Sequence, residues 1–97
     1  MAEYVLAFRQ STKDSTPEIE QAWGAWFGRI GAHIVDQGHR VGQARMVGTP
    51  SAGSDELGGY IVVRGDSLDA AVAIAEGCPG LGSGGRVEVG ELVPDQQ

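Results

Sequence analysis

The sequence predicts an α+β fold of the ferredoxin-like type, in which a four-stranded antiparallel sheet carries two helices on one face. Two segments, 3–9 and 57–64, are apolar on both faces, as the central strands of a sheet are. A capped helical segment follows each of them, and two weaker strand patterns complete the order β-α-β-β-α-β. Right-handed crossovers then place strands one and three in the middle of the sheet and strands two and four at its edges.

Length and composition indicate one small globular domain over residues 1–97, with an ordered core at about 3–93. The net charge of −6 and the scattered basic residues argue against a nucleic-acid partner. No signal-peptide pattern is present, and no apolar run reaches the roughly 20 residues of a membrane span. We therefore expect a cytoplasmic protein with no membrane partner. The single cysteine, Cys78, is expected to be a half-buried structural residue.

The first half of the chain predicts one strand, at 3–9, and one long helix. Thr16 followed by Pro17 is a helix start, because a hydroxyl accepts free N–H groups and proline is tolerated at the first helical position. The apolar residues that follow share one helical face: Ile19, Trp23, Trp26, Phe27, Ile30 and Ile34. Gly38 stands where a residue just past a helix end is expected, so the helix should end shortly before it.

Three further strands and one turn-rich connection are predicted after this helix. Residues 41–48 predict an edge strand, because polar residues interrupt it, and residues 49–56 form a turn-rich connection. The second central strand occupies 57–64. Residues 86–93 alternate partly between apolar and polar, as an edge strand does, and a polar tail completes the chain.

The second helix is predicted from its two ends. Asp66 or Ser67 caps its start, and Gly77 and Pro79 end it. The residues expected to face the core are Leu68, Val72 and Ala75.

Several segments together resemble the YCII-related family, including its DGPF branch, in their order and spacing: Leu57 to Val63, the helix start at Ser67, residues 77–79 and residues 85–89. The resemblance implies a ferredoxin-like fold that dimerises into an α/β-barrel-like assembly, mostly without an assigned biochemical function. The family's proposed catalytic His position falls on Phe27, and its Asp position falls on Cys78. The Asp-Gly-Pro-Phe motif is also missing, so the resemblance brings no catalytic pair to this chain.

His33 and Asp36 are the candidate catalytic residues, because the predicted helix places them one turn apart with Arg29 one turn before His33. A carboxylate beside a histidine raises its pKa and orients its ring, which a general base needs. The alternative is a solvated charge cluster on the helix surface. His39, just past the predicted helix end, is expected to be exposed to solvent.

The candidate ligand-binding residues are Arg29, Tyr4, Tyr60 and Arg64. The last three, together with Arg9, lie on the central strands and are candidates to line a pocket on the uncovered sheet face. Tyr4 and Arg9 differ in parity, so they cannot both point to one face of a regular strand. Tyr60 and Arg64 share a strand face by their spacing. No metal site is predicted, since two histidines and one cysteine lie far apart in the sequence. No cofactor is predicted either, because the glycine pairs match neither a phosphate loop nor a dinucleotide fingerprint.

Two classes of function stay open at this point. The first is a small-molecule-binding protein without a catalytic pair of the family's type. The alternative is a cofactor-free enzyme, similar to an oxygenase or isomerase, that acts on a small organic substrate with His33 and Asp36. In both cases we expect a homodimer through the open sheet face, because two helices cover one apolar face of strands one and three and leave the other bare.

Overall fold

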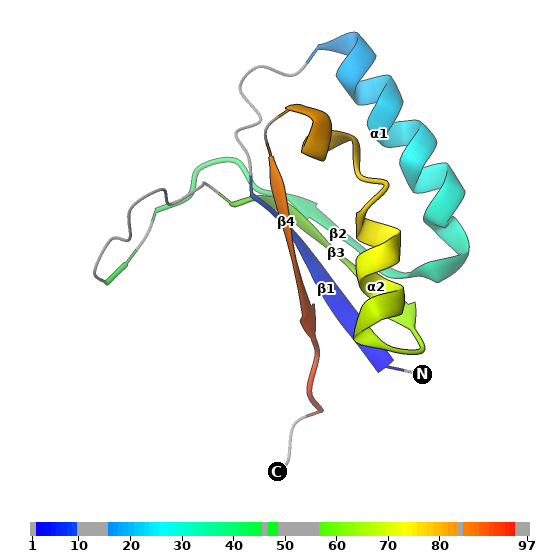
Figure 1. Ribbon diagram of the computed structural model, residues 1–97. Coiled ribbons are helices and arrows are strands. Elements are labelled where there is room, and N and C mark those ends of the chain that lie inside the picture. Colours follow the sequence, from blue (N-terminus) through cyan, green and yellow to red (C-terminus); the bar gives the residue numbers. More distant parts are fainter. Residues whose placement is uncertain (1, 10–15, 46, 49–56, 84, 95–97) are drawn as a thin grey trace.

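The chain forms one antiparallel sheet with two helices on a single face, as Figure 1 shows for the computed structural model. The structure describes residues 2–9, 16–45, 47–48, 57–83 and 85–94. Its elements are β1 (Ala2–Arg9), α1 (Pro17–Ile30), the 3-10 turn η1 (Gly31–His33), β2 (Ile34–Arg40), β3 (Leu57–Gly65), α2 (Leu68–Ala75), the 3-10 turn η2 (Pro79–Ser83) and β4 (Arg86–Glu91). The strand order β2-β3-β1-β4 confirms the ferredoxin-like fold and the central positions of β1 and β3.

Both helices begin where the sequence predicts, because a hydroxyl accepts a backbone N–H at each start. Thr16 Oγ1 accepts from the Ile19 amide at 3.2 Å, and Pro17 is the first helical residue. Ser67 Oγ accepts from the Ala70 amide at 3.1 Å. Caps of this kind stabilise a helix by about 1 kcal/mol each.

The end of the first helix differs from the prediction. Helix α1 stops at Ile30, and the segment expected to continue it forms η1 and then β2. Ile34 keeps its place in the core, but it does so as a strand residue that pairs with Val63. Glycines at 28 and 31 weaken the helix at this point. The predicted strand at 41–48 is therefore wrong in its described residues, since the second strand lies at 34–40.

The core lies between the helices and the side of the sheet that they cover. Its buried members are Tyr4, Leu6, Phe8, Trp26, Ile30, Ile61, Val63, Ala71, Ala75 and Cys78. Four aromatic rings join α1 to β1, with centroid separations of 5.0–5.9 Å among Phe8, Trp23, Trp26 and Phe27. Trp26 is 1% exposed, and its indole N–H has no hydrogen-bond partner among the described residues.

Helix α2 packs through small residues, which corrects the predicted core face. Ala71 and Ala75 are buried, whereas Leu68 and Val72 are 49% and 37% exposed. A Cβ added at Gly65 would lie only 3.6 Å from the Ala71 amide, so α2 begins very close to the end of β3. The small side chains permit this approach, and the larger apolar residues consequently lie at the helix flank.

No helix among the described residues is long and apolar enough to cross a membrane.

Candidate functional site

The side of the sheet away from the helices, here called the open face, carries an apolar centre. The strand registers place Val5 and Ala7 of β1 opposite Val62 and Tyr60 of β3 on this face. These four residues are only partly buried, because no element of the described chain lies over them. Gly90 belongs to the same face, since a Cβ built there would lie 3.6 Å from a methyl group of Val5.

Charged residues surround this apolar centre on all four strands. By register and alternation they are Glu3, Arg9, Asp36, Arg64, Arg86 and Glu88. Arg9 and Glu88 form an ion pair, with 3.1 Å between the guanidinium Nη2 and the carboxylate Oε1. The Arg9 side chain is 32% exposed, so much of its aliphatic stem packs against the sheet.

Strand β2 is irregular where it passes the open face. Asp36 pairs with Val62 and His39 pairs with Tyr60, so three steps along β2 match two steps along β3. The extra residue is a bulge, which re-aims the side chains that follow it. Without it, Asp36 and His39 would lie on opposite faces, because successive strand residues alternate. A second register shift, between Ile34 and Asp36, moves Asp36 away from the covered face of Ile34. With both irregularities, Asp36 and His39 lie on the open face.

The bulge is maintained by the backbone conformation of Gly38 and by one hydrogen bond. Gly38 adopts a φ of 62°, in the left-handed region that glycine occupies without strain. The Gly38 amide donates a hydrogen bond of 2.8 Å to Asp36 Oδ1. As a result the His39 ring lies beside the Tyr60 ring, with their centroids 6.3 Å apart and their planes inclined by 58°.

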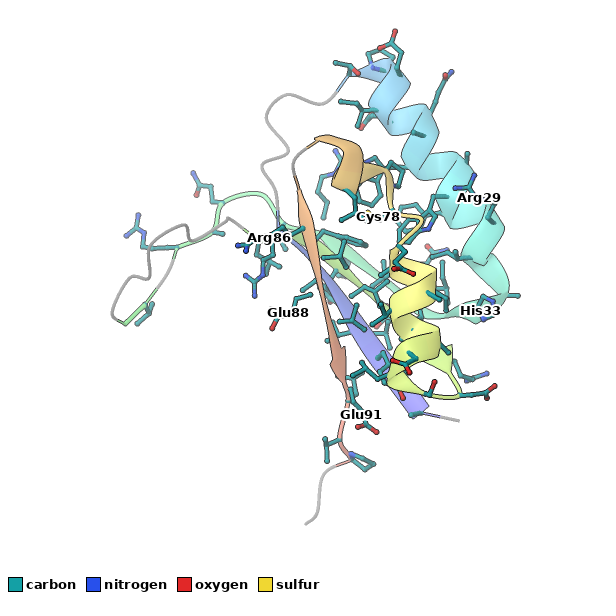
Figure 2. The ribbon with its side chains drawn as sticks, viewed as in Figure 1. Arg29, His33, Cys78, Arg86, Glu88 and Glu91 are labelled. Carbon is teal, nitrogen blue, oxygen red and sulfur yellow. The ribbon has the colours of Figure 1, made fainter. Side chains whose placement is uncertain are left out.

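The structure separates the predicted catalytic pair into two elements. His33 lies in η1, and Asp36 lies in β2, so the helical turn that they were expected to share is absent. Figure 2 shows Arg29 and His33 on the helix side of the molecule, and Arg86 and Glu88 on the opposite side. His33 is exposed, and one carboxylate oxygen of Asp36 is engaged by the Gly38 amide.

The predicted ligand-binding residues lie on two sides of the sheet. Tyr60 and Arg64 lie on the open face by register. Tyr4 was predicted there, which is wrong: it is 3% exposed and packs among the core residues under the helices. Burial, together with the negative charges of Glu91 and Asp66, raises the pKa of the Tyr4 hydroxyl above its ordinary value.

Sequence reasoning did not include His39 among the site residues and expected it beyond a helix end. His39 is exposed, as predicted, but it lies within strand β2. The signal was present in the β-branched pair Ile34 and Val35, which favours a strand over a continued helix. Gly38 was likewise assigned to a helix end, although its left-handed conformation is needed inside β2.

Cys78 is buried in the connection between α2 and η2 (Figure 2). Burial raises the pKa of its thiol above the ordinary value, against the opposite effect of the backbone amides of Gly80 and Leu81. A raised pKa means a small thiolate fraction at neutral pH and therefore low reactivity. Among the described residues, no group of three or more His, Cys, Asp or Glu side chains is placed to hold a metal ion.

The titration of Cys78 predicts a loss of stability in alkaline solution. The folded state holds the thiol proton more tightly than the unfolded chain, whose cysteine titrates near 9.0. Between the two pKa values the folded state binds more protons, so the free energy of unfolding falls as the pH rises above about 9. We expect urea unfolding curves of Cys78→Ala between about pH 8 and pH 10 to show a shallower fall than those of the unsubstituted protein. Parallel falls in the two proteins would contradict the assignment.

Comparison with known proteins gives a structural likeness. No protein-family model matches the chain, and no curated protein matches its sequence. The fold is similar to that of 5-chloro-2-hydroxyhydroquinone dehydrochlorinase (TftG) from Burkholderia phenoliruptrix AC1100, solved in complex with 2,5-dihydroxybenzoquinone. The TM-score is 0.63, and the alignment covers 96% of each chain at 19% sequence identity. This likeness supports the ferredoxin-like fold.

Proposed function

We propose that this protein binds a small organic molecule between the open faces of two copies that form a homodimer. The observation that carries the proposal is the apolar centre of the open face, which the two helices leave uncovered. Monomeric proteins rarely expose a contiguous apolar patch of this kind. A twofold partner covers it, and side chains that do not interdigitate fully leave room for a ligand between the sheets.

The charge on the open face supports a second copy as the partner. The chain carries a net charge of −6, so two copies repel each other over most of their surface. On the open face, however, three arginines balance three carboxylates: Arg9, Arg64 and Arg86 against Glu3, Asp36 and Glu88. A face with alternating charges of both signs can complement its own twofold image.

The structural neighbour supports a small molecule as the ligand. That protein was solved with 2,5-dihydroxybenzoquinone, so a fold of this type accommodates a small planar compound. The same fold supports the proposal that the chain is a divergent YCII-related protein. At 19% identity the neighbour's own chemistry is not transferred to this chain.

Cofactor-free catalysis is the second candidate, because the neighbour bears the name of an enzyme. The pair His33 and Asp36 is not favoured for it, since the two residues lie in different elements and His33 is exposed. A thermal-shift screen of metabolites against the unsubstituted protein and His33→Ala distinguishes the two candidates. Equal shifts in both proteins would exclude His33 from the ligand site.

The homodimer gives a prediction with a matched control. We expect sedimentation at micromolar concentration to give about twice the chain mass of 10.1 kDa. Val62→Asp places a charge at the centre of the open face and should give a monomer, because a buried unpaired carboxylate opposes association. Val72→Asp, on the exposed flank of α2, should leave the dimer intact. Dimers in both variants would show that another surface holds the copies together.

A further inference from the structure

The bulge in β2 is built so that it brings His39 to Tyr60. A Cβ at position 38 would overlap the Tyr60 carbonyl oxygen, so this path of the chain requires glycine. The Asp36 carboxylate supports the same turn through its hydrogen bond to the Gly38 amide. Bulges are frequent beside functional sites, where they re-aim a side chain. Here the redirected side chain is His39.

One row of the sheet runs from this histidine across all four strands. His39, Tyr60, Ala7 and Glu88 are successive neighbours in the registers. Adjacent strands lie about 4.8 Å apart, so the backbones at Tyr60 and Glu88 are separated by about 10 Å. Ala7 lies between them, and its small side chain forms a low apolar floor. That width accommodates one six-membered ring with a polar group at each edge.

The two edges of this floor carry different hydrogen-bonding groups. On the β2 side, the Tyr60 hydroxyl and the His39 imidazole can each donate or accept, which suits a hydroxyl group. The opposite edge, on β4, carries the Glu88 carboxylate. Arg9 lies two residues along β1 from Ala7 and on the same face, and its guanidinium Nη2 lies 3.1 Å from Glu88 Oε1, so the cation is held at that edge. Its contact with Glu88 engages one nitrogen of a group that has five N–H donors. Within the described part of the chain, the other donors of the guanidinium remain for a carboxylate, which matches it in shape.

We propose that the open face binds a planar ring that carries a hydroxyl group at the His39 and Tyr60 edge and a carboxylate at the Arg9 edge. This proposal rests on the proposed function and deepens it by naming the ligand class and the residues that recognise it. The ring lies over Ala7, and the second copy of the chain closes the site from the other side.

The test uses 4-hydroxybenzoate as the probe, with phenol and benzoate as compounds that each lack one of its two polar groups. The chain has only two histidines, so their ring signals in an NMR titration of the full chain distinguish the proposed site from the helix side. We expect 4-hydroxybenzoate to shift the His39 signal and to leave the His33 signal in place. Phenol and benzoate should bind at least about 10-fold more weakly, because each loses a hydrogen-bonded or charged contact.

Two pairs of variants sharpen the test. His39→Gln and Arg9→Gln should each weaken the binding of 4-hydroxybenzoate at least about 10-fold. The matched variants His33→Gln and Arg29→Gln should stay within about twofold of the unsubstituted protein, since both residues lie on the helix side of the molecule (Figure 2). Thermal melts check that each variant folds. If a variant fails to fold, the His39 and His33 signals of the unsubstituted protein still test the proposal.

The outcomes separate this inference from the proposed function. A shift at His33 in place of His39, or full affinity in His39→Gln, would overturn the inference and leave small-molecule binding elsewhere. A folded dimer whose histidine signals do not change on addition of 4-hydroxybenzoate would overturn the proposed ligand class. A monomer in sedimentation would remove the proposed function itself.

Discussion

Replacing Gly38 with alanine is expected to destabilise this protein by about 3 kcal/mol or more. A residue with a side chain is strained at a φ of 62°, at a cost of about 1–3 kcal/mol. The new methyl group would also overlap the Tyr60 carbonyl oxygen, so β2 and β3 must move apart or the bulge must rearrange. A domain of this size is stable by only about 5–15 kcal/mol, so urea unfolding will show the loss clearly.

Gly24→Ala is the matched control for that experiment. Gly24 lies within α1, and a Cβ there would have no atom within 4 Å among its described surroundings. Alanine favours a helix over glycine by about 1 kcal/mol, so this variant should be stabilised. If Gly38→Ala were as stable as the unsubstituted protein, the bulge as described would be wrong.

Leu6→Ala is expected to cost about 2–5 kcal/mol, whereas Leu68→Ala should cost less than about 1 kcal/mol. Leu6 lies in the central strand β1 and is fully buried, so its truncation leaves a cavity under both helices. Leu68 is 49% exposed at the flank of α2 and loses little by truncation. Thermal or urea unfolding of the two variants measures the difference directly.

This pair of leucines also tests the correction to the second helix, where the sequence predicted Leu68 to face the core. A large loss in Leu68→Ala would restore the original prediction and would mean that α2 is rotated relative to the sheet. Losses of equal size in both variants would give the same conclusion.

The sequence predicted those parts of the fold that depend on local chemistry. The central strands were recognisable because 3–9 and 57–64 are apolar on both faces, and both helix starts were recognisable from their capping hydroxyls. These features identify an element without knowledge of its neighbours. The strand order then followed from the handedness of the crossovers.

Prediction failed where one residue suits two structures. Ile34 continues the apolar helical spacing of α1, yet it also fits the covered face of a strand opposite Val63. Gly38 suits a helix end and a bulge equally, and only its distance from Tyr60 in space decides between them. Because both histidines lie next to this boundary, the error paired His33 with Asp36 on one helix and left His39 out of the candidate residues.

The aromatic cluster between α1 and β1 determines what intrinsic fluorescence can measure in this protein. Trp23 and Trp26 are the two tryptophans of the chain, and both lie against Phe8 at the junction of α1 with β1. Intrinsic fluorescence therefore follows the docking of one helix on one strand. The open face lies across the sheet from both indoles, so dissociation of the proposed dimer, or release of the proposed ligand, should change the emission little. A measurement that follows tryptophan emission alone therefore reports the packing of the helical layer and does not detect binding or association at the open face.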